Sequence, residues 1–347
     1  MMKEKSMPGS GSRSRNGRVG RGAPPALYDV VIVGGGPAGL SAALVLGRCR
    51  RRVLVIDAGR PRNAAAREMH GYLSRDGLNP RQLLQLGRDE IARYGVEFLN
   101  AEVDDARCLY PGDDTVPMTS FQVVTEDGRR FLSRKLLLAT GVRDVLPEID
   151  GVEKYYGSGV HHCPYCDGWE HRDQRLVAYG SGRAAVGLAL SLKTWSSRVT
   201  ACTDGKRIAP KDRERLGRNG IALRTERIAR LDGDEEALRL VVFEDGPPLE
   251  CDALFFNTEQ VQRSELPHML GCETKDRNQI RTHDKQRTCL PGLFLAGDAD
   301  GDVQFVIVAA AEGARAAVAI NRDLQDEDRG EAEAPQRPAT TSAVDRS

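Results

Sequence analysis

Cys163 and Cys166 are the two residues of this chain best placed to do redox chemistry, because two residues separate them and a glycine-rich turn lies on either side of the pair. A Cys-x-x-Cys pair can be a redox-active dithiol or half of a zinc site. The chain has eight cysteines, and no other two lie this close together. This scatter does not resemble the disulfide framework of a secreted protein, so it favours a reducing, cytoplasmic setting and a redox role for the pair.

The residues around the pair predict how its thiols would be activated. Pro164 predicts a short helix that begins at the pair, since proline is tolerated in a first helical turn. A helix N-terminus lowers the pKa of a thiol and raises the reactive thiolate fraction. Asp167 could exchange a proton with the neighbouring Cys166 thiolate, and His161 and His162 could assist, although surface or hydrogen-bonded roles are more common for such histidines. No second Cys-x-x-Cys pair completes a set of four zinc ligands, so we predict no metal.

The first glycine-rich turn predicts a dinucleotide site. It follows a short apolar run at residues 28–33, precedes a segment of helical composition at 38–46, and is followed by a β-branched run that ends at Asp57. Glycines in this pattern permit the tight turn, the approach of a pyrophosphate and close helix–strand packing, while the helix N-terminus faces the phosphates. Asp57 is then placed to accept hydrogen bonds from an adenosine ribose. The residues of the turn are Gly34, Gly35, Gly36, Pro37, Ala38 and Gly39.

The second glycine-rich turn repeats this arrangement. It comprises Gly180, Gly182 and Ala185, and the strand, helix and strand predicted around it are residues 175–179, 184–195 and 198–202. Asp204 lies just beyond the last of these strands, where an enzyme that uses NADPH usually carries arginines for the 2′-phosphate. Its carboxylate would repel that phosphate, although Lys206 and Arg207 are close. NADPH, NADH and a domain that binds no nucleotide therefore all remain open.

The two units predict an α/β protein with two Rossmann-like dinucleotide-binding domains, each a three-layer fold around a parallel central sheet. Further strands are expected as a hairpin at 121–125 and 135–139 and as a pair at 238–243 and 253–257. A strand at 292–298 and a helix near 312–321 return to the first domain, so the second domain is expected as an insertion. The expected boundaries are 27–149 with 280–322, then 150–279, with disordered tails at 1–26 and 323–347.

The charge balance of the chain argues against a polyanionic or membrane partner. Among 347 residues, 50 are lysine or arginine and 50 are aspartate or glutamate, so we expect no nucleic acid and no membrane among the partners. The two most apolar stretches, residues 26–47 and 303–320, are interrupted by charged side chains, so neither predicts a membrane span. Residues 1–26 lack the apolar core of a signal peptide.

Together these residues resemble the low-molecular-weight thioredoxin reductase family over about residues 28–321. The landmarks are the two glycine-rich turns, Thr140-Gly141, Cys163-Pro164-Tyr165-Cys166-Asp167-Gly168 and the run that ends in Gly297-Asp298. The resemblance implies FAD in the first domain, with Asp298 on its ribityl chain and the helix near 312–313 pointing at its isoalloxazine. It also implies a homodimer, and a domain rotation that alternates the access of dithiol and nicotinamide to the flavin.

The same resemblance assigns roles to the dithiol. Cys166 would face the flavin, Cys163 would exchange with the substrate, and Asp167 would be the general acid. The protein would then be an FAD-dependent thiol-disulfide oxidoreductase that relays electrons between NADPH or NADH, FAD and the cysteine pair. Its substrate would be a thioredoxin-like protein or a small disulfide or dithiol.

Three departures from the family pattern bear on this expectation. Thr203-Asp204-Gly205 stands where the family has His-Arg-Arg, and residues 258–264 replace a glycine-containing loop, so both changes weaken NADPH use. Gln304-Phe305-Val306 stands in place of Arg-Gln-Ala, which makes Gln304 and Phe305 part of the expected flavin surroundings. These departures look like those of dithiol oxidases, which close a disulfide in a small molecule and pass electrons from FAD to oxygen. That activity is the alternative function, whereas the intact cysteine pair beside Asp167 argues against a non-enzymatic flavoprotein.

Overall fold

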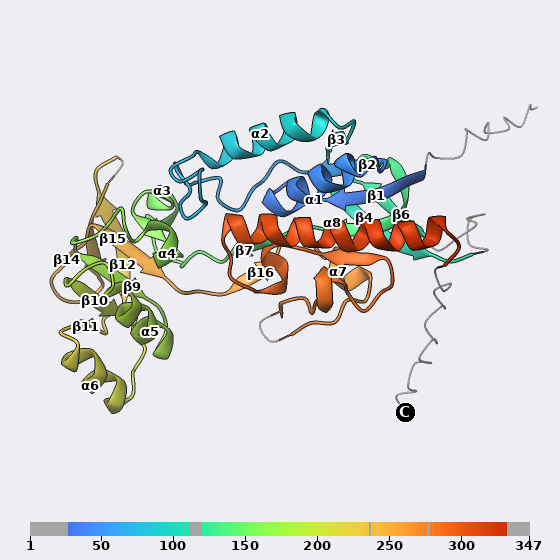
Figure 1. Cartoon of the computed structure of the whole chain (residues 1–347). Helices are drawn as coiled ribbons and strands as arrows, with labels where there is room; N and C mark the ends of the chain where they lie inside the picture. Colours follow the sequence, from blue (N-terminus) through green and yellow to red (C-terminus); the bar gives the residue numbers. More distant parts are fainter. Residues whose placement is uncertain (1–26, 112–119, 236, 276–277, 332–347) are drawn as a thin grey trace, which may run out of the picture.

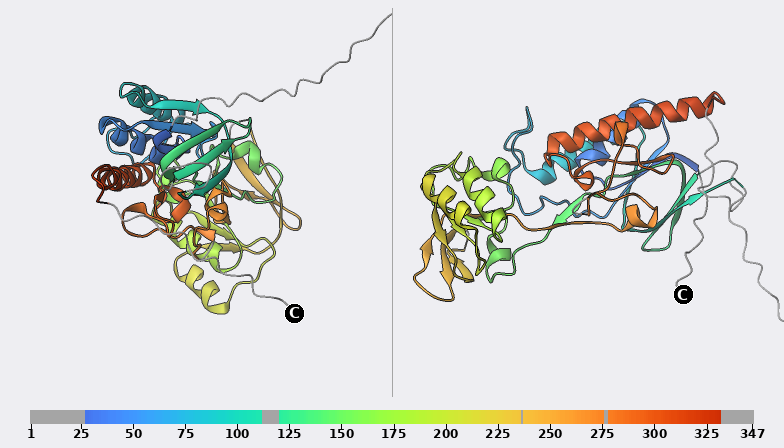
Figure 2. Two further views of the ribbon diagram at one scale, coloured as in Figure 1. Left: turned by 90° about the vertical axis from the view of Figure 1, so that its right-hand side faces the viewer. Right: turned by 90° about the horizontal axis from the view of Figure 1, so that it is seen from below.

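The computed structural model describes residues 27–111, 120–235, 237–275 and 278–331. These residues form two α/β domains, which lie end to end and are joined by two extended crossings (Figure 1, Figure 2). The first domain contains both ends of the described chain, and the second domain is inserted into it. The tail predicted at 1–26 and residues 332–347 of the other predicted tail lie outside the described residues.

The first domain is built on a seven-stranded sheet in the order β3-β2-β1-β6-β5-β4, with β17 also paired to β6. β3, β2, β1, β6 and β17 run parallel, whereas β5 is antiparallel to both of its neighbours and forms the predicted hairpin with β6. The strands are β1 (Leu27–Val33), β2 (Val53–Asp57), β3 (Glu97–Asn100), β4 (Val103–Leu109), β5 (Ser120–Thr125), β6 (Arg130–Leu138) and β17 (Leu293–Leu295).

Helices cover this sheet because its central strands are apolar on both faces. Val30, Val31 and Ile32 of β1 are fully buried, which is typical of a parallel strand between two layers. Helices α1 and α8 pack closely, since a Cβ at Gly313 would lie 2.0 Å from the carbonyl oxygen of Ala38. The helices of this domain are α1 (Pro37–Arg48), α2 (Pro80–Ala92), α7 (Leu266–Met269) and α8 (Val306–Asp328), with the 3-10 turns η2 (Asp284–Gln286) and η3 (Asp298–Asp300).

The second domain has a five-stranded parallel sheet in the order β11-β10-β9-β15-β8 and a smaller antiparallel sheet, β12-β13-β14. The strands are β8 (Val160–His161), β9 (Leu176–Tyr179), β10 (Val199–Cys202), β11 (Ala222–Arg224), β12 (Ile228–Gly233), β13 (Leu238–Phe243), β14 (Leu249–Glu250) and β15 (Ala253–Phe256). The helices are α3 (Val152–Tyr155), α4 (Pro164–Asp167), α5 (Arg183–Leu192) and α6 (Pro210–Arg218). The predicted architecture, two Rossmann-like domains with the second inserted into the first, is confirmed.

The strand pair expected at 238–243 and 253–257 is wrong, because β13 and β15 belong to different sheets. All four residues of β15 are buried, which suits the interior of a parallel sheet. In β13, buried and more exposed positions are mixed, as expected for an antiparallel strand with one wet face. Proximity in sequence suggested the pairing, and the burial of both faces of β15 decides against it.

Two short strands carry the chain between the domains: β7 (Val142–Asp144) leaves the first domain, and β16 (Gln260–Gln262) returns to it antiparallel to β7. The second domain was expected to end at residue 279, so the structure has the chain return about 20 residues earlier. Leu266, Leu270 and Ile280 lie in the core of the first domain with strands β1, β6 and β17. The described part of the intervening segment includes the one-turn helix α7, whose few apolar residues do not reveal from sequence which core they join.

Helix α8 also extends further than expected. It continues to Asp328, past the predicted start of the tail at 323, because Leu324 is fully buried and Arg134 pairs with Glu327 at 2.9 Å. Arg51 adds an ion pair to Asp328 at 2.7 Å. Within the described residues, none of the helices is both long and apolar enough to cross a membrane.

Candidate active site

A cavity between the two domains brings most of the predicted site residues together. Its walls include one face of the disulfide-bonded pair and both glycine-containing segments of the first domain. From the first domain come Gly34, Gly36, Pro37, Ala38, Asp57, Thr140, Gly141, Gly297, Asp298, Gln304 and Phe305, and from the second domain His162, Cys166 and Asp167. Cys163 and Gly39 are not part of this wall, although each is a chain neighbour of a residue that is, and Gly180, Gly182 and Ala185 lie elsewhere in the second domain.

The first glycine turn leaves room for a ligand at the N-terminus of α1. Gly34 has a φ of +106°, and a Cβ there would lie 2.3 Å from the Ala139 carbonyl oxygen. A Cβ at Gly39 would lie 1.9 Å from the Gly34 carbonyl oxygen, so these two glycines serve the turn and the packing of α1. At Gly36, by contrast, nothing lies within 4 Å of a Cβ. Gly36 therefore exposes backbone at a helix N-terminus, which is the arrangement that binds phosphates.

Asp57 and Thr140 add polar groups to the same cavity. The Asp57 carboxylate accepts a hydrogen bond from the Gly35 N–H at 2.9 Å and pairs with Arg88 at 3.1 Å. The Thr140 hydroxyl oxygen is buried and has no hydrogen-bond partner among the described residues. A buried orphan hydroxyl is unfavourable unless a ligand satisfies it. The open Gly36 backbone, the Asp57 carboxylate and this hydroxyl fit a dinucleotide such as FAD.

The cysteine pair sits at the start of a short helix, as predicted. Cys163 and Cys166 form a disulfide with a Cα–Cα distance of 5.3 Å. Cys163 caps α4, and its sulfur accepts the Cys166 N–H at 3.2 Å. Since α4 has only four residues, its dipole is weak and this N–H is the main local donor to a Cys163 thiolate. Tyr165, which lies between the two cysteines, is 71% exposed. Its ring centroid lies 6.4 Å from the ring centroid of Phe305 in the first domain.

Asp167 is connected to two histidines behind the disulfide. His161, which is 5% exposed, lies with Nδ1 3.3 Å from Oδ1 of Asp167 and with Nε2 2.9 Å from Nε2 of His171. Burial favours the protonated form of Asp167, but the hydrogen bond and charge of His161 outweigh it and lower the pKa of this carboxyl. Sequence alone suggested that His161 could assist the pair, and it did not single out His171, which is ten residues away and carries no motif.

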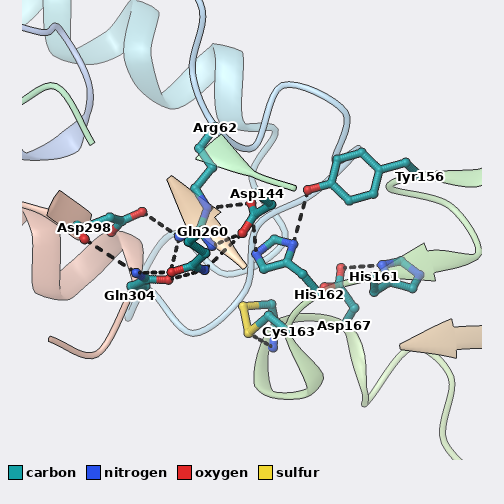
Figure 3. The surroundings of a disulfide bond; sticks show 11 residues. Arg62, Asp144, Tyr156, His161, His162, Cys163, Asp167, Gln260, Asp298 and Gln304 are labelled. Atoms are coloured by element: carbon teal, nitrogen blue, oxygen red, sulfur yellow. Dashed lines mark hydrogen bonds and ion pairs between the residues drawn. A yellow bond between two sulfur atoms is a disulfide. The ribbon is translucent and has the colours of Figure 1, made fainter. Parts of the chain in front are cut away.

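A second polar cluster, which we call the Arg62 clamp, fixes the crossings to the first domain (Figure 3). Arg62 binds Asp144 of β7 with two nitrogens, at 2.7 and 2.6 Å, and reaches Asp298 at 2.8 Å. Gln304 accepts from Arg62 at 2.8 Å and exchanges hydrogen bonds with Gln260 of β16 at 2.9 Å. The predicted residues Asp298 and Gln304 thus form part of a network whose other members carried no signal in sequence.

The Arg62 clamp touches the dithiol side of the cavity through His162. The His162 Nε2 lies 4.0 Å from Asp144, and its Nδ1 lies 3.3 Å from the Tyr156 hydroxyl. Burial lowers the pKa of His162, although the charge of Asp144 opposes this shift. Burial also raises the pKa of Tyr156 to about 12, and Asp144 adds to that rise. His162 is therefore a neutral cavity wall near pH 7, between the clamp and the disulfide.

The second glycine turn has the expected backbone but lies outside this cavity. Gly182 has a φ of +54°, and Ala185 is fully buried against the strand. The Asp204 carboxylate accepts hydrogen bonds from the Tyr179 hydroxyl at 3.1 Å and from the Ile228 N–H at 2.9 Å. Asp204 is thus held in place as a fixed negative charge beyond β10. Whether this turn receives a nicotinamide coenzyme stays a prediction.

Comparisons with known proteins agree with this architecture. The family model described as pyridine nucleotide-disulphide oxidoreductase matches residues 28–313. A protein of Arthroderma benhamiae named "Probable thioredoxin reductase" is 32% identical over 92% of this chain and 86% of its own length. Thioredoxin reductase tcpT of Claviceps purpurea is 32% identical over 78% of this chain and 86% of its own length.

Solved structures extend the likeness to three dimensions. The crystal structure of HlmI has 37% sequence identity and a TM-score of 0.83, covering 87% of this chain and 94% of HlmI. An oxidoreductase from Agrobacterium tumefaciens has 33% identity and a TM-score of 0.78, covering 86% and 99% of the two chains. The chain belongs to the pyridine nucleotide-disulphide oxidoreductase family, and it is an FAD-dependent oxidoreductase that acts on sulfur groups.

Proposed function

We propose that this protein is a thioredoxin-reductase-like oxidoreductase that relays electrons between NADPH or NADH, FAD and the Cys163–Cys166 pair, and from there to a disulfide substrate. One observation carries the proposal: Cys166 and Asp167 line the same cavity as the first glycine turn. A flavin held by that turn and the cysteine pair would therefore share one enclosed space. A thioredoxin-like or small disulfide partner and a homodimer belong to this proposal through the family resemblance.

The residues of the first domain would hold the cofactor. Gly36 and the N-terminus of α1 would bind the pyrophosphate, Asp57 the adenosine ribose, and Thr140 would find a partner for its orphan hydroxyl. Asp298, held by Arg62 at 2.8 Å, would bind the ribityl chain. When bound, FAD supplies a two-electron acceptor or donor for the dithiol.

The residues of the second domain would handle the sulfur chemistry. Cys166 faces the cavity, whereas Cys163 is not part of its wall, so we assign exchange with the substrate to Cys163. Asp167, next to Cys166 and ionised by His161, would take up and return the proton of the Cys166 thiol. Among the described cysteines, five are free thiols, which supports a reducing, cytoplasmic setting: Cys49, Cys202, Cys251, Cys272 and Cys289.

A specific observation favours a second candidate function, dithiol oxidation with oxygen as the acceptor. Asp204 is fixed by Tyr179 and Ile228 at the position where a 2′-phosphate would need positive charge. A fixed carboxylate there opposes NADPH by like-charge repulsion. In this second function a small dithiol would reduce the Cys163–Cys166 disulfide, and the electrons would leave through the flavin to oxygen.

Anaerobic reduction of the purified flavoprotein tests both candidates. NADPH, NADH and dithiothreitol are added in turn, and bleaching of the flavin absorbance is followed. Rapid bleaching by a nicotinamide supports the reductase, and rapid bleaching by dithiothreitol alone supports the oxidase. A protein that binds no flavin would contradict the proposal as a whole.

Two cysteine variants separate the relay from a general loss of structure. Cys166→Ser should abolish bleaching by dithiothreitol, because it removes the thiol that faces the cavity. Cys289→Ser, which alters an exposed free cysteine of the first domain, is the matched control and should bleach like the parent protein. Unchanged bleaching in Cys166→Ser would remove the cysteine pair from the electron path.

A further inference from the structure

A line of hydrogen-bonding side chains leads from the cavity to the surface of the second domain. Asp167 lines the cavity, His161 is buried behind it, and His171 and Gln174 are partly exposed on the far side. The three contacts are 3.3 Å from Asp167 to His161, 2.9 Å between the two histidines, and 3.0 Å from Nδ1 of His171 to Oε1 of Gln174.

With the Gln174 side-chain oxygen as the acceptor at one end, the contacts give a consistent assignment of the protons. The Gln174 oxygen only accepts, so Nδ1 of His171 carries a proton and donates it. A neutral His171 then has a bare Nε2, which must accept from Nε2–H of His161. Nδ1 of His161 faces a carboxylate and also carries a proton. His161 thus has both ring nitrogens placed to donate, one toward Asp167 and one toward His171, so its geometry suits an imidazole that holds an extra proton beside Asp167.

The surroundings agree with this proton count. Burial, together with the charge of His161, lowers the pKa of His171, which favours a neutral His171 with a bare Nε2. The Phe255 ring of β15 packs against His161 at 5.3 Å, which leaves Asp167 and His171 as the polar partners of this imidazole. The other titratable groups nearby are His162, which turns toward Asp144, and Glu170, beside His171.

We propose that His161 stores the proton that Asp167 exchanges with Cys166, and we call His161 the proton store. His171 orients the His161 ring by accepting a hydrogen bond from its Nε2–H. His161 acts through Asp167 and is a positioning residue rather than a catalytic one. The inference rests on the proposed function, in which the cysteine pair exchanges electrons with flavin.

The step balances in both directions. When a dithiol reduces the disulfide, the dithiol forms its own S–S bond, gives up two electrons and releases its two protons to solvent, and the Cys163–Cys166 bond breaks to leave two thiolates. The Cys166 thiolate takes one proton, passed from Nδ1 of His161 through Asp167, and the Cys163 thiolate stays charged as the nucleophile. When the pair is oxidised by the flavin, the S–S bond forms, two electrons leave, and the Cys166 proton returns through Asp167 to a neutral His161.

Removing the store should make the transfer depend on pH. His161→Gln keeps a side chain that can donate to Asp167 but cannot hold the extra proton. Without His161 the Cys166 proton has no destination beyond Asp167, so oxidation of the pair follows the ionisation of the thiol, and an ordinary thiol has a pKa of about 8.5. We therefore expect flavin bleaching by dithiothreitol to be slower by about tenfold or more at pH 6.5 and to recover towards pH 9.

The experiment is anaerobic stopped-flow bleaching of the flavoprotein by dithiothreitol between pH 6 and 9. His161→Gln and His171→Gln are compared with the parent protein and with His283→Gln, a matched change at an exposed histidine of the first domain. The His171 side chain is half-buried, so His171→Gln keeps the test available if His161→Gln does not fold. This variant should shift the pH profile of flavin bleaching in the same direction as His161→Gln.

The outcomes distinguish this inference from the proposed function. A loss of bleaching rate that is confined to low pH supports His161 as the proton store. An unchanged profile, or a loss of equal size at every pH, overturns it while the parent protein still bleaches. Failure of the parent protein itself to bleach with dithiothreitol or either nicotinamide would instead contradict the proposed function.

Discussion

Replacing Arg62 by methionine should destabilise the protein by leaving a buried carboxylate without its partner. The Asp144 side chain is 5% exposed and the Arg62 side chain 14% exposed, and two hydrogen bonds of 2.6 and 2.7 Å join them. Methionine has a similar length and no charge, so it fills the space without replacing the ion pair. Asp144 would keep the Gln260 amide at 3.0 Å, the Tyr156 hydroxyl and the more distant His162.

The expected cost is about 3 to 5 kcal/mol, the range for removing one member of a buried ion pair. The Gln260 hydrogen bond that remains favours the lower end, about 3 kcal/mol. For a domain of this size 1 kcal/mol corresponds to about 2–4 °C in Tm, so we expect the first domain to unfold roughly 6 to 12 °C lower. A surface ion pair would cost less than about 1 kcal/mol.

The loss should also depend on pH, with a sign set by Asp144. Burial opposes its ionisation, but Arg62 and His162 outweigh burial and lower its pKa, so in the parent protein the pair stabilises above the unfolded pKa and is lost as pH falls. In Arg62→Met the buried carboxyl loses its arginine and its pKa rises above the unfolded value. In acid, protonation of Asp144 removes the buried charge of the variant. The difference in Tm between the variant and the parent protein should therefore be large at pH 8 and small at pH 4.5.

Thermal unfolding followed by circular dichroism at these two pH values checks the prediction, with Arg62→Met/Asp144→Asn as the companion variant. Removing both charges leaves no buried ion, so the double variant should recover much of the loss and show little change with pH. Equal midpoints for Arg62→Met and the parent protein would refute the reasoning. So would a loss that is the same at both pH values and is not relieved in the double variant.

Two further substitutions test packing and burial. Gly313→Ala places a Cβ 2.0 Å from the Ala38 carbonyl oxygen and should destabilise the protein by at least about 1–3 kcal/mol. Gly217→Ala on α6 meets no atom within 4 Å and should be neutral or slightly stabilising. Urea unfolding of the two variants measures the difference. Burial raises the pKa of Glu312 to about 7, so the folded carboxyl disfavours the ionisation that the unfolded chain allows above about 4.5. The free energy of unfolding of Glu312→Gln should therefore rise by about 2–3 kcal/mol relative to the parent protein between pH 5 and pH 8. Unfolding midpoints of both proteins at the two pH values test this, and an equal difference at both would contradict it.

The parts that sequence predicted are those whose logic is local. The first glycine turn, its flanking strand and helix, and Asp57 lie within one short stretch, and steric demands at Gly34 and Gly39 fix their spacing. The cysteine pair likewise defines its own short helix through Pro164. These features could be read from residue types alone, because each constraint acts between near neighbours in the chain.

The parts that sequence missed depend on contacts between distant segments. Arg62 meets Asp144, 82 residues later, and Asp298, 236 residues later, and neither spacing has a periodic signature. His171 reaches His161 only because the loop after α4 folds back against β8. The return of the chain at β16 was missed for the same reason, since a three-residue strand whose residues are all half-buried gives no pattern to detect.

The two polar clusters beside the cavity belong to different parts of the molecule, so the stability of the crossings and the proton transfer at Cys166 depend on different residues. The Arg62 clamp joins the crossings to loops of the first domain, whereas Asp167, His161 and His171 all lie in the second domain. If the second domain rotates, as the resemblance to thioredoxin reductases implies, the proton store travels with the cysteine pair. The pair would then carry its own proton acceptor both to the flavin and to the substrate. Proton transfer at Cys166 would need no group on the first domain, whichever direction the electrons take.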